Sequence, residues 1–187
     1  MTGCLFALLA ALLAGFGARD QMLMAQLSAR SGPRPMLLIT GITTGALASG
    51  LAAWATREVA AELNHGACLL VAAMALAMAG AESLLLAPGK APAEPTNSLG
   101  AAAIVLFADQ ITDSARCLIL AIALASEQPF AAGVGGAVGT AVALALGGGL
   151  ARSLLDAGPM LRTIRRIAGL ALLAAGGVLV ARLLSAQ

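Results

Sequence analysis

Six long apolar segments constrain this chain more than any other feature of its sequence. A helix needs ~20 mostly apolar residues to cross a bilayer, and the segments that qualify cover residues 4–28, 36–56, 66–87, 99–125, 130–151 and 164–184. Hydrophobic residue types make up 60% of the 187 residues and charged types 11%, which is more apolar surface than a soluble domain of this size can bury. No alternating barrel pattern appears, and backbone polar groups must be paired in lipid. The sequence therefore predicts an all-α membrane protein with six transmembrane helices.

Several function classes are not expected for such a chain. The net charge of +2 is small and spread over loops, so nucleic acid is not an expected partner. No nucleophile and base are paired in the sequence, so no enzyme and no resident cofactor are expected. His65 is the only histidine and falls at a segment edge, and the three cysteines are isolated in apolar segments and are expected to be core residues: Cys4, Cys68 and Cys117. The first segment lacks the basic start of a signal peptide and is expected to stay as a span.

The chain repeats itself in two halves. Asp20 lies 93 residues before Asp113, and each aspartate sits in a first segment that ends before a proline, Pro35 or Pro129. Matching glycines follow in the second and third segments of each half: Gly41 and Gly45 with Gly135 and Gly139, and Gly80 with Gly176. Three helices is an odd number, so residues 99–187 are expected to be inverted relative to residues 1–87. Inverted repeats are a transporter architecture with a site near the midplane.

Basic residues and glycines complete the expected layout. Seven basic residues lie on the side of the Pro-rich linker at residues 88–98: Arg30, Arg34, Lys90, Arg152, Arg162, Arg165 and Arg166. Arg57 and Arg182 lie on the other side. This bias predicts a cytoplasmic linker and both termini outside, in a bacterial inner membrane. The Gly-rich second segments predict close helix–helix approach, and a homo-oligomer is possible.

The stretch FADQITDSARC places charges inside the fourth segment. If residues 99–125 form one helix, Asp109, Thr112, Asp113 and Arg116 share a face. A charge near the middle of a span costs ~2.5–3.5 kcal/mol on insertion scales, so such a group is a functional-site hypothesis by default. The structural alternative is that Arg116, one turn from Asp113, only neutralises it.

The first half carries a corresponding acidic residue, Asp20, beside Arg19. Inverted repeats would bring Asp20 and Asp113 together across a pseudo-two-fold axis. Two carboxylates with amide, hydroxyl and backbone oxygens suit a hard cation such as Ca²⁺ or Mn²⁺. The expected secondary ligands are Asp109, Gln110, Thr112 and Ser114, while Glu82 is expected to reach the membrane edge instead.

This layout resembles the Gdt-type (TMEM-type) manganese/calcium–proton exchangers, uncharacterised protein family 0016. Their hallmark is Glu-x-Gly-Asp-Lys-Thr/Ser, once in the first helix of each three-helix half. GARDQM and QITDSA stand in its place here, and only Asp20 and Asp113 match the hallmark. Gly17 and Gln110 replace the two glutamates, and Asp109 lies one residue away from the second. The resemblance covers nearly the whole chain through its helix count, prolines and Gly-rich second helices.

The leading hypothesis is a transporter that exchanges Mn²⁺ or Ca²⁺ for protons. Asp20 and Asp113 would be the primary ligands or proton carriers, with Arg19 and Arg116 as charge-compensating groups. The lost glutamates leave two alternatives open. One is a divergent, non-transporting membrane partner or regulator of the same fold. The other is a small six-helix exporter of an anionic or amino-acid substrate that uses the arginines.

Overall fold

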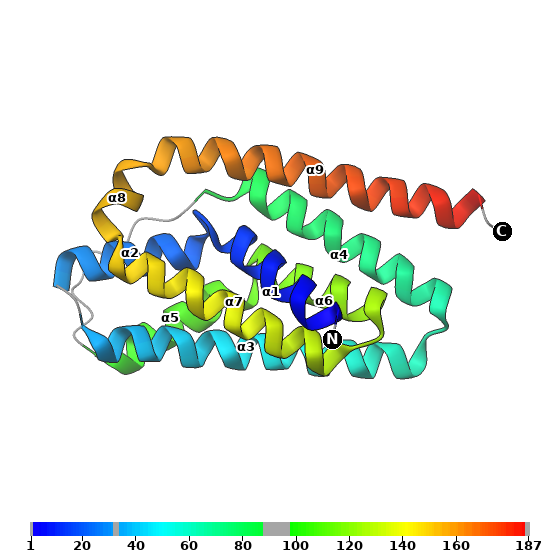
Figure 1. The fold of residues 1–187 in the computed structure, drawn as a ribbon, viewed down its shortest axis with the longest axis horizontal. Helices are drawn as coiled ribbons and strands as arrows, with labels where there is room; N and C mark the ends of the chain where they lie inside the picture. Colours follow the sequence, from blue (N-terminus) through cyan, green and yellow to red (C-terminus); the bar gives the residue numbers. More distant parts are fainter. Residues whose placement is uncertain (1, 32–33, 88–97, 186–187) are drawn as a thin grey trace.

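The computed structural model describes residues 2–31, 34–87 and 98–185, and the regular structure of these residues is helical (Figure 1). In chain order the helices are α1 (Thr2–Gly15), α2 (Arg19–Ser31), α3 (Pro35–Glu62), α4 (His65–Leu85), α5 (Leu99–Ile111), α6 (Ser114–Ser126), α7 (Pro129–Gly149), α8 (Ala151–Asp156) and α9 (Gly158–Ser185). The predicted all-α class is confirmed. The predicted linker, with Lys90, lies outside the described residues except for Ser98.

Among the described residues, four helices are long and apolar enough to cross a membrane: α3, α4, α7 and α9. The pair α1 and α2 passes the same test together but is bent by 55° at the break between them. The predicted fourth span is divided into α5 and α6, which have 13 residues each. The helices are thus compatible with a multi-pass membrane protein with four or five spans by length, and the sixth span remains a prediction.

Both predicted first spans are broken next to their aspartate. In the first half the chain leaves the helix at residues 16–18, where Gly17 has a φ of 68°, a conformation that favours glycine because it has no Cβ. In the second half Asp113 has an extended backbone and caps α6, since its side chain accepts a hydrogen bond of 3.3 Å from the Ala115 N–H. The expected single helical face from Asp109 to Arg116 is therefore wrong, because the helix is interrupted at Thr112 and Asp113.

The two halves interlock rather than lie apart. α7 packs against α1 and α3, and α4 packs against α6 and α9 (Figure 1). Gly135 faces the backbone of Cys4, and a methyl group at Gly139 would lie 2.5 Å from the Leu8 carbonyl oxygen, so α1 and α7 can touch only because these positions are glycine. The predicted close approach is confirmed for α7.

The outside of the bundle is apolar. Large exposed side chains lie on most of the helices, among them Leu13, Leu47, Met78, Ile104, Phe130 and Ile167. α9 is buried only at Arg165, Gly169 and Gly176, along the stripe that contacts α4. Exposed apolar patches of this extent are typical of a surface that faces lipid or a partner.

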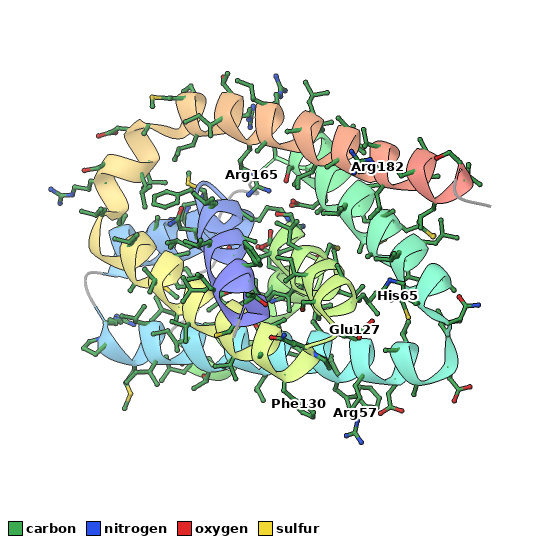
Figure 2. All side chains as sticks on the ribbon, turned by 45° about the vertical axis from the view of Figure 1, so that its right-hand side comes forward. Arg57, His65, Glu127, Phe130, Arg165 and Arg182 are labelled. Atoms are coloured by element: carbon green, nitrogen blue, oxygen red, sulfur yellow. The ribbon has the colours of Figure 1, made fainter. Side chains whose placement is uncertain are left out.

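Two contacts tie the helices at the end where α3 turns into α4. His65 Nδ1 lies 3.0 Å from Glu127 Oε1, and the Arg57 guanidinium lies 5.9 Å from the centre of the Phe130 ring. Figure 2 shows these four side chains together, while Arg165 lies elsewhere and points from α9 toward the bundle. His65 is exposed at the first turn of α4, as its position in the sequence indicated.

Candidate functional site

The two helix breaks meet through a contact that is exposed in the structure. Arg19, the first residue of α2, donates from Nη2 to the Thr112 carbonyl oxygen at 3.2 Å and to the Thr112 hydroxyl at 2.9 Å. Most of the predicted site residues are buried around this contact: Asp20, Gln110, Asp113, Ser114 and Arg116. Asp109 and Thr112, at the end of α5, are more accessible. The structure thus brings the two polar segments together although they lie 93 residues apart.

Four charged side chains form a neutral network, here called the Arg19 cluster: Arg19, Glu82, Asp109 and Arg165. Arg19 Nε lies 3.1 Å from Glu82 Oε1, and its Nη1 lies 3.3 Å from Asp109 Oδ1. Arg165 Nη2 lies 2.8 Å from Glu82 Oε2, and its Nη1 donates to the Ala14 carbonyl at the end of α1 at 3.2 Å. Two arginines and two carboxylates therefore satisfy one another, as charges in a low-dielectric interior require.

The sequence did not predict that Glu82 and Arg165 are buried and paired. Glu82 was expected at the membrane edge and Arg165 among the loop residues, but both side chains are buried and paired with each other. Hydropathy alone could not find this pair, because each residue lies near the end of its apolar segment, where charges are ordinary. Only the packing of α4 against α9 brings them together.

Asp20 and Asp113 lie outside the Arg19 cluster. In the described part of the chain, neither carboxylate has an arginine, lysine or histidine nitrogen within 4.0 Å. Both are almost fully buried, and Asp113 and Arg116 act electrostatically on Asp20. Asp20 Oδ1 accepts a 2.7 Å hydrogen bond from the Gln21 N–H. The two aspartates are thus buried acids whose charges no adjacent cation cancels directly.

Arg116 does not pair with Asp113 as the structural alternative required. Its Nη1 donates instead to the Thr140 hydroxyl of α7 at 2.8 Å, and its side chain is buried. Thr140 follows Gly139 in the Gly-rich segment and carried no signal of a site in the sequence. Arg116 is therefore held by α7 and leaves the carboxylate of Asp113 available.

Five buried polar atoms of this segment have no hydrogen-bond partner among the described residues: Gln110 Oε1, Asp113 Oδ1, Ser114 Oγ, Arg116 Nε and Arg116 Nη2. The other end of the Gln110 amide donates to the Gly41 carbonyl at 3.1 Å. Gly45 adjoins both side chains, since a methyl group there would lie 3.3 Å from Gln110 Nε2 and 3.7 Å from Arg116 Nη2. An unpaired buried polar group costs about 1–3 kcal/mol, so these atoms offer donors and acceptors to a water, an ion or a ligand.

Gln21 has a structural role that the motif comparison did not indicate. Its Oε1 accepts from the Gly17 N–H at 2.8 Å, and its Nε2 donates to the Ala143 carbonyl of α7 at 2.8 Å. The side chain thus closes the break between α1 and α2 and fixes it to α7. An uncharged amide takes both roles.

The charge balance limits what the site can hold. The site contains four carboxylates, Asp20, Glu82, Asp109 and Asp113, and three guanidinium groups, so one net negative charge remains. Within residues 2–31, 34–87 and 98–185, no group of three or more His, Cys, Asp or Glu side chains is arranged to hold a metal ion. A hard cation here would need amide, hydroxyl and carbonyl oxygens to complete its shell.

Comparison of the chain with protein-family models, with curated proteins and with solved structures finds no match. The resemblance to the exchanger family stays a prediction that rests on the two aspartates and the layout of the segments.

Proposed function

We propose that this chain is a membrane transporter that moves a cation, with Mn²⁺ or Ca²⁺ as the first candidates, in exchange for protons. The observation that carries the proposal is the meeting of two broken helices, each with a buried aspartate where its second part begins. Broken helices are tolerated at membrane depth where the freed backbone is buried in protein or lines a cavity. In transporters they form the substrate site at the interface of the repeats.

The contacts between the halves support inverted repeats. Arg19 and Thr112 contact each other and are separated by the same 93 residues as Asp20 and Asp113. A two-fold axis between two repeats brings equivalent residues near the axis into contact. Equivalent helices also pack together, α3 against α7 and α4 against α9. With the excess of basic residues on one side, we place the linker in the cytoplasm and both termini outside a bacterial inner membrane.

Within this proposal, Asp20 and Asp113 carry the cation or the proton. Arg19 and Arg165 are occupied by Glu82 and Asp109, so these acids are compensated already. The remaining negative charge lies between the two aspartates and Arg116, and a single proton neutralises it when the cation is absent. Gln110 Oε1 and the hydroxyl of Ser114 are buried oxygens beside Asp113 that can complete a cation shell.

The test is proton and metal flux in proteoliposomes. Under an imposed pH gradient, the wild-type protein is expected to move Mn²⁺ or Ca²⁺ with an opposite movement of protons, and Asp20→Asn or Asp113→Asn is expected to abolish both. Asp156→Asn is the matched control, because Asp156 is an exposed residue at the end of α8. Wild-type liposomes with neither flux, or full flux in the Asp20/Asp113 double variant, would contradict the proposal.

One observation favours a second candidate, a small anion or amino acid as substrate. Arg116 has two buried nitrogen atoms without a partner in the described residues, and a guanidinium is suited to hold a carboxylate through two parallel hydrogen bonds. Thermal unfolding in detergent distinguishes the candidates. The second candidate is supported if amino acids or anions stabilise the wild-type protein, Arg116→Gln removes that effect, and Mn²⁺ and Ca²⁺ do not stabilise the protein. Cation transport is supported if Mn²⁺ or Ca²⁺ stabilises the protein and amino acids and anions do not.

A further inference from the structure

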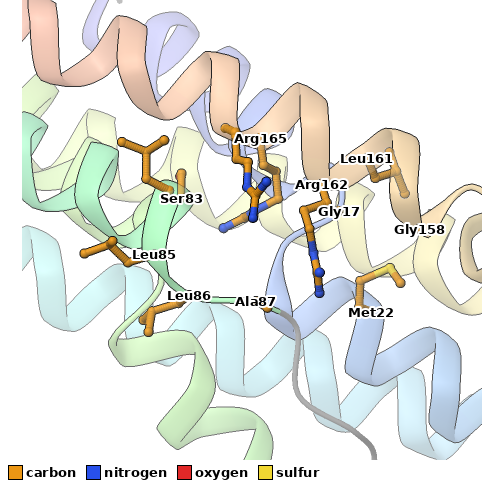
Figure 3. A pocket seen from close by; sticks show the side chains of 12 residues that line it. Gly17, Met22, Ser83, Leu85, Leu86, Ala87, Gly158, Leu161, Arg162 and Arg165 are labelled. Atoms are coloured by element: carbon orange, nitrogen blue, oxygen red, sulfur yellow. The ribbon is translucent and has the colours of Figure 1, made fainter.

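A small basic cavity lies apart from the two aspartates. It has a volume of about 60 Å³ and lies between the end of α4, the first turns of α9 and the helix break at Gly17 (Figure 3). Three arginines line it, Arg162, Arg165 and Arg166, and none of the residues that line it is acidic. A cavity with this lining favours an anionic ligand.

The three arginines differ in what they already bind. Arg165 is buried and occupied by Glu82 and the Ala14 carbonyl. Arg162 and Arg166 are exposed, and no hydrogen bond or ion pair joins either side chain to another described residue. They lie one turn apart on α9, so their side chains share a face, and Figure 3 shows Arg162 reaching down beside Gly17 and Ala87. Two guanidinium groups are therefore free to hold one anion.

The apolar part of the lining indicates the kind of anion. Leu85 and Leu86, at the end of α4, are 80% and 47% exposed and line the same cavity as the arginines. α4 ends at Leu85 and α9 begins at Gly158 beside this cavity, so in the proposed membrane orientation the cavity opens from the helix break toward the lipid headgroups on the linker side. Cationic side chains at that level with exposed leucines beside them match a phospholipid, which carries a phosphate above its acyl chains.

We propose that this cavity binds the phosphate of an anionic phospholipid headgroup, with Arg162 and Arg166 as its charged contacts and Leu85 and Leu86 against its acyl chains. The proposal rests on the membrane placement of α4 and α9 and not on transport. Arg165 forms the floor of the cavity, but its charge is balanced by Glu82 and its hydrogen bonds go to Glu82 and the Ala14 carbonyl. Each basic side chain near a membrane surface raises the binding constant for anionic lipid by about fivefold.

The experiment measures lipid retained by the purified protein. Protein is taken from nanodiscs of phosphatidylcholine with and without phosphatidylglycerol, and bound lipid is counted by native mass spectrometry. Wild-type protein is expected to keep phosphatidylglycerol in preference to phosphatidylcholine, and the Arg162→Gln/Arg166→Gln variant is expected to keep it about 25-fold less, from two arginines at about fivefold each. Equal retention by the variant, or no preference in the wild type, overturns the proposal.

Two controls separate this site from other sources of binding. Arg152→Gln/Arg182→Gln removes two exposed arginines from α8 and from the far end of α9. If this control loses as much phosphatidylglycerol as the Arg162→Gln/Arg166→Gln variant, the lipid is held by a diffuse attraction to surface charge, and the proposed site is overturned. Inorganic phosphate added in detergent tests whether the cavity binds a free anion. If phosphate stabilises the protein as strongly as phosphatidylglycerol does, the proposal of a lipid ligand is overturned. Because the readout is binding, its failure is distinct from a failure of cation flux.

Discussion

Arg19 of α2 holds Thr112 at the end of α5 through both the carbonyl oxygen and the hydroxyl, at 3.2 and 2.9 Å. The same guanidinium contacts Glu82 and Asp109. One side chain thus joins the two helix breaks to each other and to α4. Because the last carbonyls of a helix have no partner within it, Arg19 also satisfies a group that the break at Thr112 exposes.

Arg19→Gln is expected to lower the free energy of unfolding by about 2 kcal/mol, because breaking a partly buried ion pair leaves uncompensated charge on its partners and partial exposure to water reduces the cost below that of a fully buried pair. Arg19→Lys is the matched control: it keeps the charge but cannot reach three partners with one planar group, so an intermediate loss is expected. Thermal and denaturant unfolding in detergent measure both. Equal stability of Arg19→Gln and wild type would show that the contact does not hold the breaks together.

Glu82 and Arg165 are expected to be energetically coupled. Their side chains are both buried and lie 2.8 Å apart, so removing either partner leaves the other charge unpaired. A double-mutant cycle of Glu82→Gln and Arg165→Gln should give an interaction energy of about 2 kcal/mol, with the double variant more stable than the sum of the single effects predicts. Additive effects would contradict a direct pair.

Gly17→Ala is expected to destabilise the protein by about 1 kcal/mol. The φ of 68° at Gly17 is costly for a residue with a Cβ, and the added methyl would lie 3.0 Å from Leu161 Cβ. Gly50→Ala in α3 is the matched control, because no atom lies within 4 Å of a methyl there. Alanine in a helix should stabilise by about 0.5–1 kcal/mol, so opposite shifts of the unfolding temperature are expected.

Apolar length made the helices predictable, whereas their interruptions were not. The sequence located the segments of α3, α4, α7 and α9 because ~20 apolar residues in a row are a strong signal. It missed the breaks at Gly17 and Asp113, since a short irregular stretch changes neither length nor composition. An aspartate singled out by its depth lies at each break, and its role in a site stays a prediction.

The partners of the site depended on packing that one sequence does not contain. Asp20 and Asp113 could be singled out from their depth, but Thr140 lies in a Gly-rich segment without any polar pattern. The alternative that Arg116 pairs with Asp113 followed from helical spacing, and it is wrong because the helix starts again at Ser114 and α7 offers the Thr140 hydroxyl. Local periodicity predicts contacts only where the helix is continuous.

Asp113→Asn and Asp113→Ala should separate the structural from the functional role of this residue. Asn caps a helix as well as Asp, so Asp113→Asn is expected to keep the wild-type unfolding temperature while it removes the charge. Asp113→Ala also loses the bond from the Ala115 N–H and should cost about 1 kcal/mol of stability. Cation flux is expected to be lost in both. Flux that survives in Asp113→Asn would assign Asp113 to the cap alone.

Arg116→Gln should decide between the two candidate substrates. It raises the net negative charge of the site from one to two. At an effective dielectric near 20, removing a unit positive charge about 10 Å from a divalent ion is worth ~3.3 kcal/mol. If the cargo is a divalent cation, Arg116→Gln is expected to bind Mn²⁺ or Ca²⁺ more than about 100-fold more tightly by calorimetry. Arg116→Lys, which keeps the charge, should not.

The opposite pattern identifies an anion or amino-acid site. There Arg116→Gln abolishes substrate binding, and Arg116→Lys recovers part of it, because the charge remains but the two-point contact with a carboxylate is lost. Both variants lose the 2.8 Å bond to Thr140, so Thr140→Val serves as the control for that loss. Thr140→Val removes the hydroxyl and leaves the charge of Arg116 unchanged. A binding change shared by Thr140→Val and Arg116→Gln would therefore come from the position of the arginine and not from its charge.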